Sequence, residues 1–111
     1  MATDPSYLGE FEHLVLLAIA RVGGKAGGAQ IHNELEAVGR RGCSLPAIYV
    51  TLGRLTTKGY IRAADTVPQE AGGRPRRLFE ITRAGSMAMR ATRETLERMW
   101  SDVPALARPR R

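Results

Sequence analysis

The segment from Ser44 to Gly59 restricts the fold of this chain more than any other part of the sequence. Ser44 is a typical N-cap residue, and Pro46 falls in the first helical turn, where its missing N–H costs little. Gly59 predicts that the helix ends near Lys58. Apolar residues recur between these signals with helical spacing. They predict a buried face made of Leu45, Ile48, Leu52 and Leu55.

The opposite side of this helix is unusual for a face in contact with water. A solvated face usually carries several Lys and Glu side chains, whereas this face is small and has Arg54 as its one charge. We place Tyr49 on its flank and therefore expect the face to approach another molecule closely. At about 100° per residue, the outward positions are Pro46, Ala47, Val50, Gly53, Arg54 and Thr57.

Two further helices are predicted before this one. The first begins near Leu8 and is ended by Gly23 and Gly24, which start a glycine-rich turn. Its apolar face consists of Leu8, Phe11, Leu14, Val15 and Ala18, widened by Leu16, Leu17 and Ile19. The second runs from about Gly28 to Val38, with Ile31, Leu35 and Val38 on its buried face.

A hairpin and a last helix follow the third helix. Residues 60–67 and 76–81 read as two strands, joined by a loop over residues 68–75. Thr82 is a candidate N-cap for a helix from about Arg83 to Trp100. The spacings in Met89, Leu96, Met99 and Val103 are close to a heptad seam.

The order helix, helix, helix, hairpin, helix predicts a mainly helical α+β fold. It is that of a winged helix-turn-helix with a C-terminal helix for dimerisation. We divide the chain into a winged helix-turn-helix over residues 1–82, a dimerisation helix over 83–103 and a basic tail over 104–111.

The charge of the chain is unevenly distributed. Lys and Arg number 17 against 11 Asp and Glu, and the net charge is +6. Residues 1–39 carry two basic and five acidic residues, whereas residues 40–111 carry fifteen basic and six acidic ones. This polarity predicts a polyanionic partner, with the acidic N-terminal part facing away from it. Composition alone does not choose among nucleic acid, a membrane surface and an acidic protein.

The fold class favours double-stranded DNA. In a winged helix-turn-helix the third helix enters the major groove and the hairpin lies over the backbone or reaches the minor groove. Small outward side chains allow contact with base edges, hydroxyl groups can bind phosphates, and Arg54 can bind a guanine edge or a phosphate. An arginine on the hairpin tip can enter a narrow minor groove. The candidate DNA-binding residues are Ser44, Ala47, Tyr49, Val50, Thr51, Arg54, Arg74, Arg76 and Arg77.

Two segments resemble one known family. Residues 44–55, followed by Lys58-Gly59-Tyr60-Ile61, resemble the recognition-helix segment of PadR-family transcriptional regulators, and residues 72–85 resemble the family's wing and the start of its last helix. The resemblance covers about residues 8 to 100, and the single C-terminal helix is similar to that of the smaller PadR subgroup. It implies a bacterial dimeric repressor that binds near-palindromic operators and responds to small aromatic or drug-like molecules.

The C-terminal helix is the expected site of dimer contact. The candidate interface residues are Phe11, Leu14, Met89, Leu96, Met99, Trp100 and Val103. Trp100 has two interpretations: it packs inside the interface, or it offers a stacking surface to a planar effector.

Other classes of function are disfavoured. The longest apolar run, Leu14 to Ala20, is too short for a membrane span, and the N-terminus lacks the features of a signal peptide. The single cysteine, Cys43, cannot form an internal disulfide, so a cytoplasmic location is expected. We interpret Cys43 as an ordinary thiol rather than a redox switch.

Chemical sites are also not expected. His13 and His32 each have one nearby glutamate but no further ligand, so no metal site or cofactor is predicted. No catalytic set of residues is evident, so we do not expect an enzyme. The alternative function is a winged-helix interaction module whose basic face binds an acidic protein.

Overall fold

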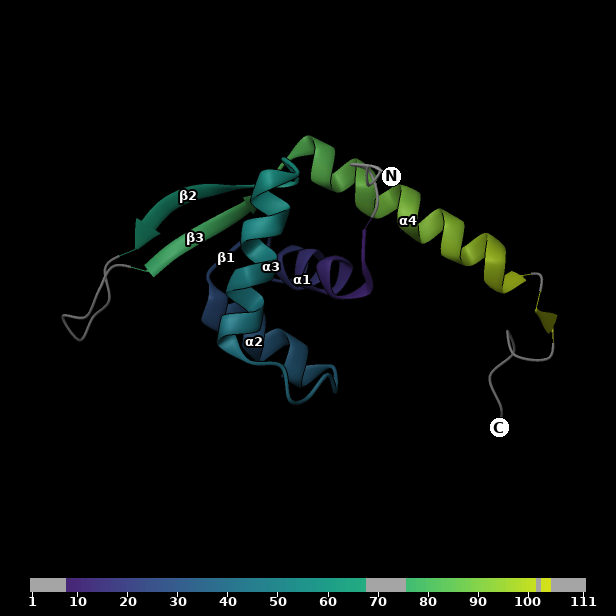
Figure 1. Cartoon of the computed structure of the whole chain (residues 1–111), viewed down its shortest axis with the longest axis horizontal. Helices are drawn as coiled ribbons and strands as arrows, with labels where there is room; N and C mark the ends of the chain where they lie inside the picture. Colours follow the sequence, from purple (N-terminus) through teal and green to yellow (C-terminus); the bar gives the residue numbers. More distant parts are fainter. Residues whose placement is uncertain (1–7, 68–75, 102, 105–111) are drawn as a thin grey trace.

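The computed structural model describes residues 8–67, 76–101, 103 and 104 (Figure 1). It contains four helices and three strands in these residues. They follow in the order α1 (Glu10–Arg21), β1 (Lys25–Ala26), α2 (Gly28–Ala37), α3 (Leu45–Thr57), β2 (Ile61–Val67), β3 (Arg76–Ile81) and α4 (Arg83–Ser101). The sequence predicted this order apart from β1, which lies in the glycine-rich turn between the first two helices.

The three strands form one antiparallel sheet in the order β1-β3-β2. β2 and β3 are the predicted hairpin, and β1 adds two residues to the other edge of β3. Lys25 pairs with Glu80 and Ala26 with Phe79, so this short strand ties the turn after α1 to the base of the hairpin. The predicted winged helix-turn-helix is confirmed. It consists of α2 and α3 with the turn between them, followed by the hairpin of β2 and β3.

The hydrophobic core lies between α1, α2, α3 and the base of the sheet. The side chains of Leu16, Ile31, Leu52 and Ile61 are almost completely buried there. Most of the predicted stripes are confirmed, but Leu17, Val38 and Leu45 are 39%, 53% and 42% exposed. Val38 is the C-cap residue of α2 and Leu45 is the first residue of α3, so both stand at helix ends beyond the packed turns.

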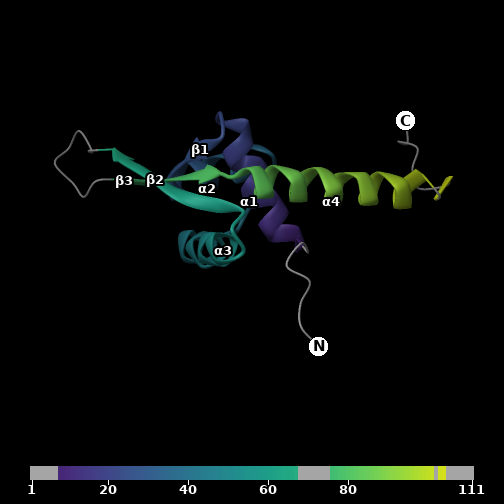
Figure 2. The same ribbon diagram turned by 90° about the horizontal axis from the view of Figure 1, so that it is seen from above.

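The hairpin and α4 extend from the three-helix body in opposite directions (Figures 1 and 2). Only the first part of α4 packs against the body, where Gly85 and Ala88 are buried. Thr82 starts this helix as predicted, because its hydroxyl accepts a hydrogen bond from Gly85 N–H at 3.1 Å and donates one to Gly59 O at 2.6 Å. From Arg93 to Ser101 every side chain of α4 is exposed.

The described part of the chain also bears on two other expectations. Within it, no helix is both long enough and apolar enough to cross a membrane. The division into residues 1–82, 83–103 and 104–111 stays a prediction, and residues 105–111 of the expected tail lie outside the described residues.

Candidate nucleic-acid interface

The third helix, α3, is fixed at its start by the residues that predicted it. Ser44 Oγ accepts a hydrogen bond from the Ala47 N–H at 3.2 Å, and Pro46 occupies the first turn. Ile48, Leu52 and Leu55 then bury one side of the helix completely. This inner side determines which residues α3 presents to solvent.

The outer side of α3 is the one that the helical spacing predicted. All six residues expected there are exposed, namely Pro46, Ala47, Val50, Gly53, Arg54 and Thr57. Val50 is 57% exposed, and a Cβ added at Gly53 would meet no atom within 4 Å. Arg54 makes no ion pair with another described residue, so its guanidinium group is available to a ligand. The outer side is therefore a low, open surface with one long cationic side chain.

Thr51 differs from the other candidate residues of α3. Its side chain belongs to the buried set and the residue is 5% exposed, so the expectation that its hydroxyl reaches a phosphate is wrong. Thr51 lies three residues after Ile48 and directly before Leu52, at the border of the apolar stripe. α3 packs against both α1 and α2.

Tyr49 lies on the flank of α3 and is 49% exposed. Its hydroxyl and ring edge lie against Gly28, the first residue of α2. The neighbour that the structure gives for this ring is therefore the start of α2. The hydroxyl therefore lies at the junction of the two helices of the helix-turn-helix.

The hairpin carries two of the three predicted wing arginines within the described residues. Arg76 and Arg77 are both exposed and pair with Val67 and Thr66 of β2. Adjacent residues of a strand point to opposite faces of the sheet, so the two side chains leave the narrow hairpin on opposite sides. Arg74 lies outside the described residues.

An ion pair that the sequence did not predict joins the end of α3 to α1. Lys58 Nζ contacts Glu12 Oε1 of α1 at 2.8 Å, with both side chains mostly buried. Burial raises the pKa of Glu12, but hydrogen bonds from Lys58 and Gly9 N–H and the charges of Lys58 and Arg54 lower it further, so the pKa is below its ordinary value. The available signal was the position of Glu12 on the apolar face of α1, four residues after Leu8.

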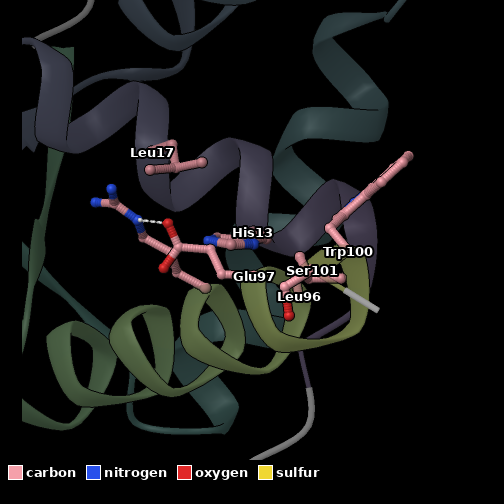
Figure 3. A pocket seen from close by; sticks show the side chains of 7 residues that line it. His13, Leu17, Leu96, Glu97, Trp100 and Ser101 are labelled. Atoms are coloured by element: carbon pink, nitrogen blue, oxygen red, sulfur yellow. Dashed lines mark hydrogen bonds and ion pairs between the residues drawn. The ribbon is translucent and has the colours of Figure 1, made fainter. Parts of the chain in front are cut away.

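A groove of about 660 Å³ lies between α1 and the exposed part of α4. Figure 3 shows Leu17 and His13 of α1 across from Leu96 and Trp100 of α4. Arg93 and Glu97 also line the groove, and Arg93 Nε lies 3.4 Å from Glu97 Oε2 in an ion pair. Burial lowers the pKa of His13, which favours the neutral imidazole. The groove is thus an apolar slot with polar groups at one side.

The α1 residues beside Trp100 in this groove differ from the two interface candidates on that helix, which stay a prediction. Phe11 and Leu14 are half-buried against the core, and the α1 residues that share the groove with Trp100 are His13 and Leu17. Met89 also packs against the core, while Leu96, Met99 and Trp100 are 48%, 66% and 54% exposed. Val103 is exposed as well. Apart from Met87, the exposed large apolar residues of α4 therefore lie near its C-terminal end.

The remaining candidate groups form no larger cluster. His32 Nε2 lies 3.9 Å from Glu36 Oε2, and Cys43 is half-buried with its thiol 3.8 Å from Arg40 O. Among the described residues, no group of three or more His, Cys, Asp or Glu side chains is arranged to hold a metal ion.

Comparison with known proteins gives the family to which this arrangement is similar. The model of the PadR-like family of transcriptional regulators matches residues 15–91. A PadR-like transcriptional regulator from Bacillus cereus is 19% identical, with a TM-score of 0.71 over 90% of this chain and 93% of that chain. A PadR-family regulator from Clostridium difficile is 17% identical, with a TM-score of 0.65 over 88% and 94% of the two chains.

A third solved structure includes DNA. Bacillus subtilis PadR in complex with operator DNA is 19% identical, with a TM-score of 0.63 over 74% of this chain and 45% of that longer chain. These likenesses show a common fold. Comparison with curated proteins gave no significant match.

Proposed function

Because this chain belongs to the PadR-like family of transcriptional regulators, we propose that it binds a specific sequence of double-stranded DNA as a dimeric repressor. The observation that carries the proposal is the outer side of α3, on which Ala47, Val50 and Gly53 are small and exposed while the inner side is buried. Such a helix can lie deep in the major groove, where side chains reach base edges. The transcriptional role of the family agrees with the expectation that the chain is not an enzyme.

Each exposed candidate residue has a role that follows from its chemistry. Arg54 is long enough to make a bidentate contact with a guanine edge, which supplies specificity. Ser44 and Tyr49 donate hydroxyl protons to phosphates and set the position of the helix. Arg76 and Arg77 on the hairpin bind the backbone or the minor groove and supply affinity that depends on salt. The fold of the Bacillus subtilis protein solved with operator DNA supports this arrangement.

The dimer rests on the exposed end of α4. Leu96, Met99 and Trp100 present apolar side chains to solvent there, and Val103, just beyond the helix, is exposed as well. A second copy that buries this surface would gain about 25 cal/mol per Å² of apolar area removed from water. Pairing also places two copies of α3 for two half-sites of a near-palindromic operator, about 34 Å apart.

The groove beside Trp100 is the proposed effector site. Leu17, Leu96 and Trp100 form apolar walls suited to a planar aromatic molecule, and the groove touches both the body and α4. An effector bound there changes how α4 lies against the body and so the spacing of the two α3 helices, which releases the DNA. Trp100 is the only tryptophan of the chain, so ligand binding is read directly from its fluorescence. If no compound of a planar aromatic panel changes the Trp100 emission or weakens DNA binding, the effector role is contradicted.

The experiment that tests DNA recognition is a competition between two duplexes. The first is recovered by the wild-type chain from a random-sequence library, and the second is its scrambled version. We expect a clear preference for the recovered duplex, and we expect Arg54→Ala to reduce that preference by about tenfold or more. Equal affinity for the two duplexes would contradict the proposal and favour the alternative, in which the basic face binds an acidic protein. We also propose that the chain acts in the cytoplasm.

A further inference from the structure

The start of α2 lies unusually close to the side chain of Tyr49. A Cβ added at Gly28 would lie 2.6 Å from Tyr49 Oη, 2.7 Å from Cζ and 3.0 Å from Cε2. Real Cβ atoms do not approach other heavy atoms this closely, so the present position of the ring requires a residue without a side chain at position 28. The ring thus lies against the backbone of the first turn of α2.

The backbone conformation of Gly28 does not explain why a glycine stands there. Gly28 lies within α2 and is not among the described glycines with positive φ. Alanine is the better helix former by propensity, so the helix alone would favour it. The feature that calls for glycine is the space that the Tyr49 ring occupies.

We propose that Gly28 is a positioning residue for Tyr49, holding the ring against α2 so that its hydroxyl is aimed at a DNA phosphate. This inference rests on the proposed function, because it assigns a role in DNA binding to a residue that does not itself offer a side chain. Tyr49 is 49% exposed, so its ring is partly free to take other directions. Contact with Gly28 removes part of that freedom before DNA binds, which lowers the entropic cost of the contact.

The preceding glycine has the same relationship to the hairpin. A Cβ at Gly27 would lie 3.1 Å from Cγ and Cδ of Arg76 and 3.2 Å from the backbone oxygen of Arg77. The stem of Arg76 therefore lies along the same end of α2 as the Tyr49 ring. The Tyr49 hydroxyl of α3 and the stem of the Arg76 side chain of β3 thus both lie at the start of α2.

The test is a double-mutant cycle on DNA affinity. Gly28→Ala, Tyr49→Ala and the double variant are titrated against the duplex that the wild-type chain recovers from a random-sequence library. Tyr49→Ala removes a hydrogen bond to a charged group and is expected to weaken binding about tenfold. Gly28→Ala alone is expected to approach the same loss, and it is expected to cause no further loss when Tyr49 is already alanine.

Two controls separate positioning from folding. Gly9→Ala is matched to Gly28→Ala, because it also lies at a helix start but its added Cβ would meet only Glu12 Oε1, at 3.6 Å. It is expected to leave DNA affinity unchanged. Thermal unfolding of all variants reports stability, and the double variant folds even if Gly28→Ala alone does not, because removal of the ring frees the space for the new Cβ.

The outcomes are distinct. Loss of affinity that requires Tyr49 supports the inference. Equal loss from Gly28→Ala with and without the Tyr49 ring would overturn it, as would no loss in either background. If the wild-type chain binds all duplexes equally, the proposed function fails and this inference fails with it. If the wild-type chain prefers one duplex, the variants test this inference alone.

Discussion

Lys58 Nζ, at the C-cap of α3, donates a hydrogen bond to Glu12 Oε1 of α1 at 2.8 Å. The same oxygen accepts a hydrogen bond from the Gly9 N–H at 2.9 Å. One carboxylate oxygen therefore joins the first turn of α1 to the last turn of the helix that we expect to enter the major groove. The Glu12 and Lys58 side chains are 10% and 21% exposed, so water screens this interaction far less than it screens a surface pair.

The first prediction concerns the strength of this link. Glu12→Gln is expected to lower the free energy of unfolding by about 1 to 3 kcal/mol, because it removes the carboxylate that contacts a largely buried ammonium group. Glu10→Gln is the matched control, since Glu10 pairs with Arg40 at the surface with 76% of its side chain exposed. Its effect is expected to stay within about 0.5 kcal/mol. Urea unfolding compares them, and equal losses would contradict the account.

The second prediction is a pH dependence that belongs to Glu12. Burial raises the pKa of its carboxyl group, but Lys58, the Gly9 N–H and Arg54 lower it below the ordinary 4.5. The unfolded chain therefore binds this proton more readily than the folded chain. The stabilisation is complete above about pH 4.5 and is lost as the pH falls through the folded-state pKa. The stability difference between wild type and Glu12→Gln should therefore shrink on acidification, and a difference that grows would refute it.

A third prediction tests how α4 is attached to the body. A Cβ at Gly85 would collide with the backbone oxygen of Tyr60, which cannot move aside like a flexible side chain. Gly85→Ala is therefore expected to destabilise the fold by about 1 to 3 kcal/mol. Gly53→Ala is the control, because its Cβ would meet nothing within 4 Å and the helix gains about 0.5 to 1 kcal/mol. Unfolding curves in which both variants change stability in the same direction would contradict the contact.

A fourth prediction addresses the proposed dimer. Light scattering of the wild-type chain at micromolar concentration is expected to give twice the 12.1 kDa of one chain. Replacing Leu96 and Met99 together by glutamate should give a monomer, because buried charge without a partner is costly. Met87→Glu is the control: Met87 is 61% exposed, but it precedes Leu96 by nine residues and so lies on the opposite side of α4. A wild-type monomer, or a dimer that survives the double replacement, would argue against the seam.

The extent to which the sequence predicted the structure depends on how local each signal is. The bounds and inner face of α3 followed from Ser44, Pro46 and the apolar spacing, all within one segment. β1 was missed because two residues carry no periodicity and its pairing partner, β3, lies about fifty residues later in the chain. The Glu12–Lys58 pair was missed for the same reason, since 46 residues separate its members.

The sequence predicted side-chain exposure only for positions that lie clearly inside or clearly outside the apolar stripe of a helix. Thr51 stands at the edge of the apolar stripe of α3, and its burial depends on how closely the neighbouring helices approach. The sequence grouped Phe11, Leu14 and Trp100 in one candidate interface, whereas within the chain Trp100 shares a groove with His13 and Leu17. The direction of α4 relative to the body is a tertiary property that spacing along one helix does not contain.

The central claim, that two copies of α3 read a two-fold symmetric DNA site, is tested most directly by a footprint on genomic fragments that the chain selects. The account predicts a discrete protected region with dyad symmetry, its half-sites centred about one helical turn, or 34 Å, apart. A protected region without dyad symmetry, or protection spread evenly along the fragments, would contradict it.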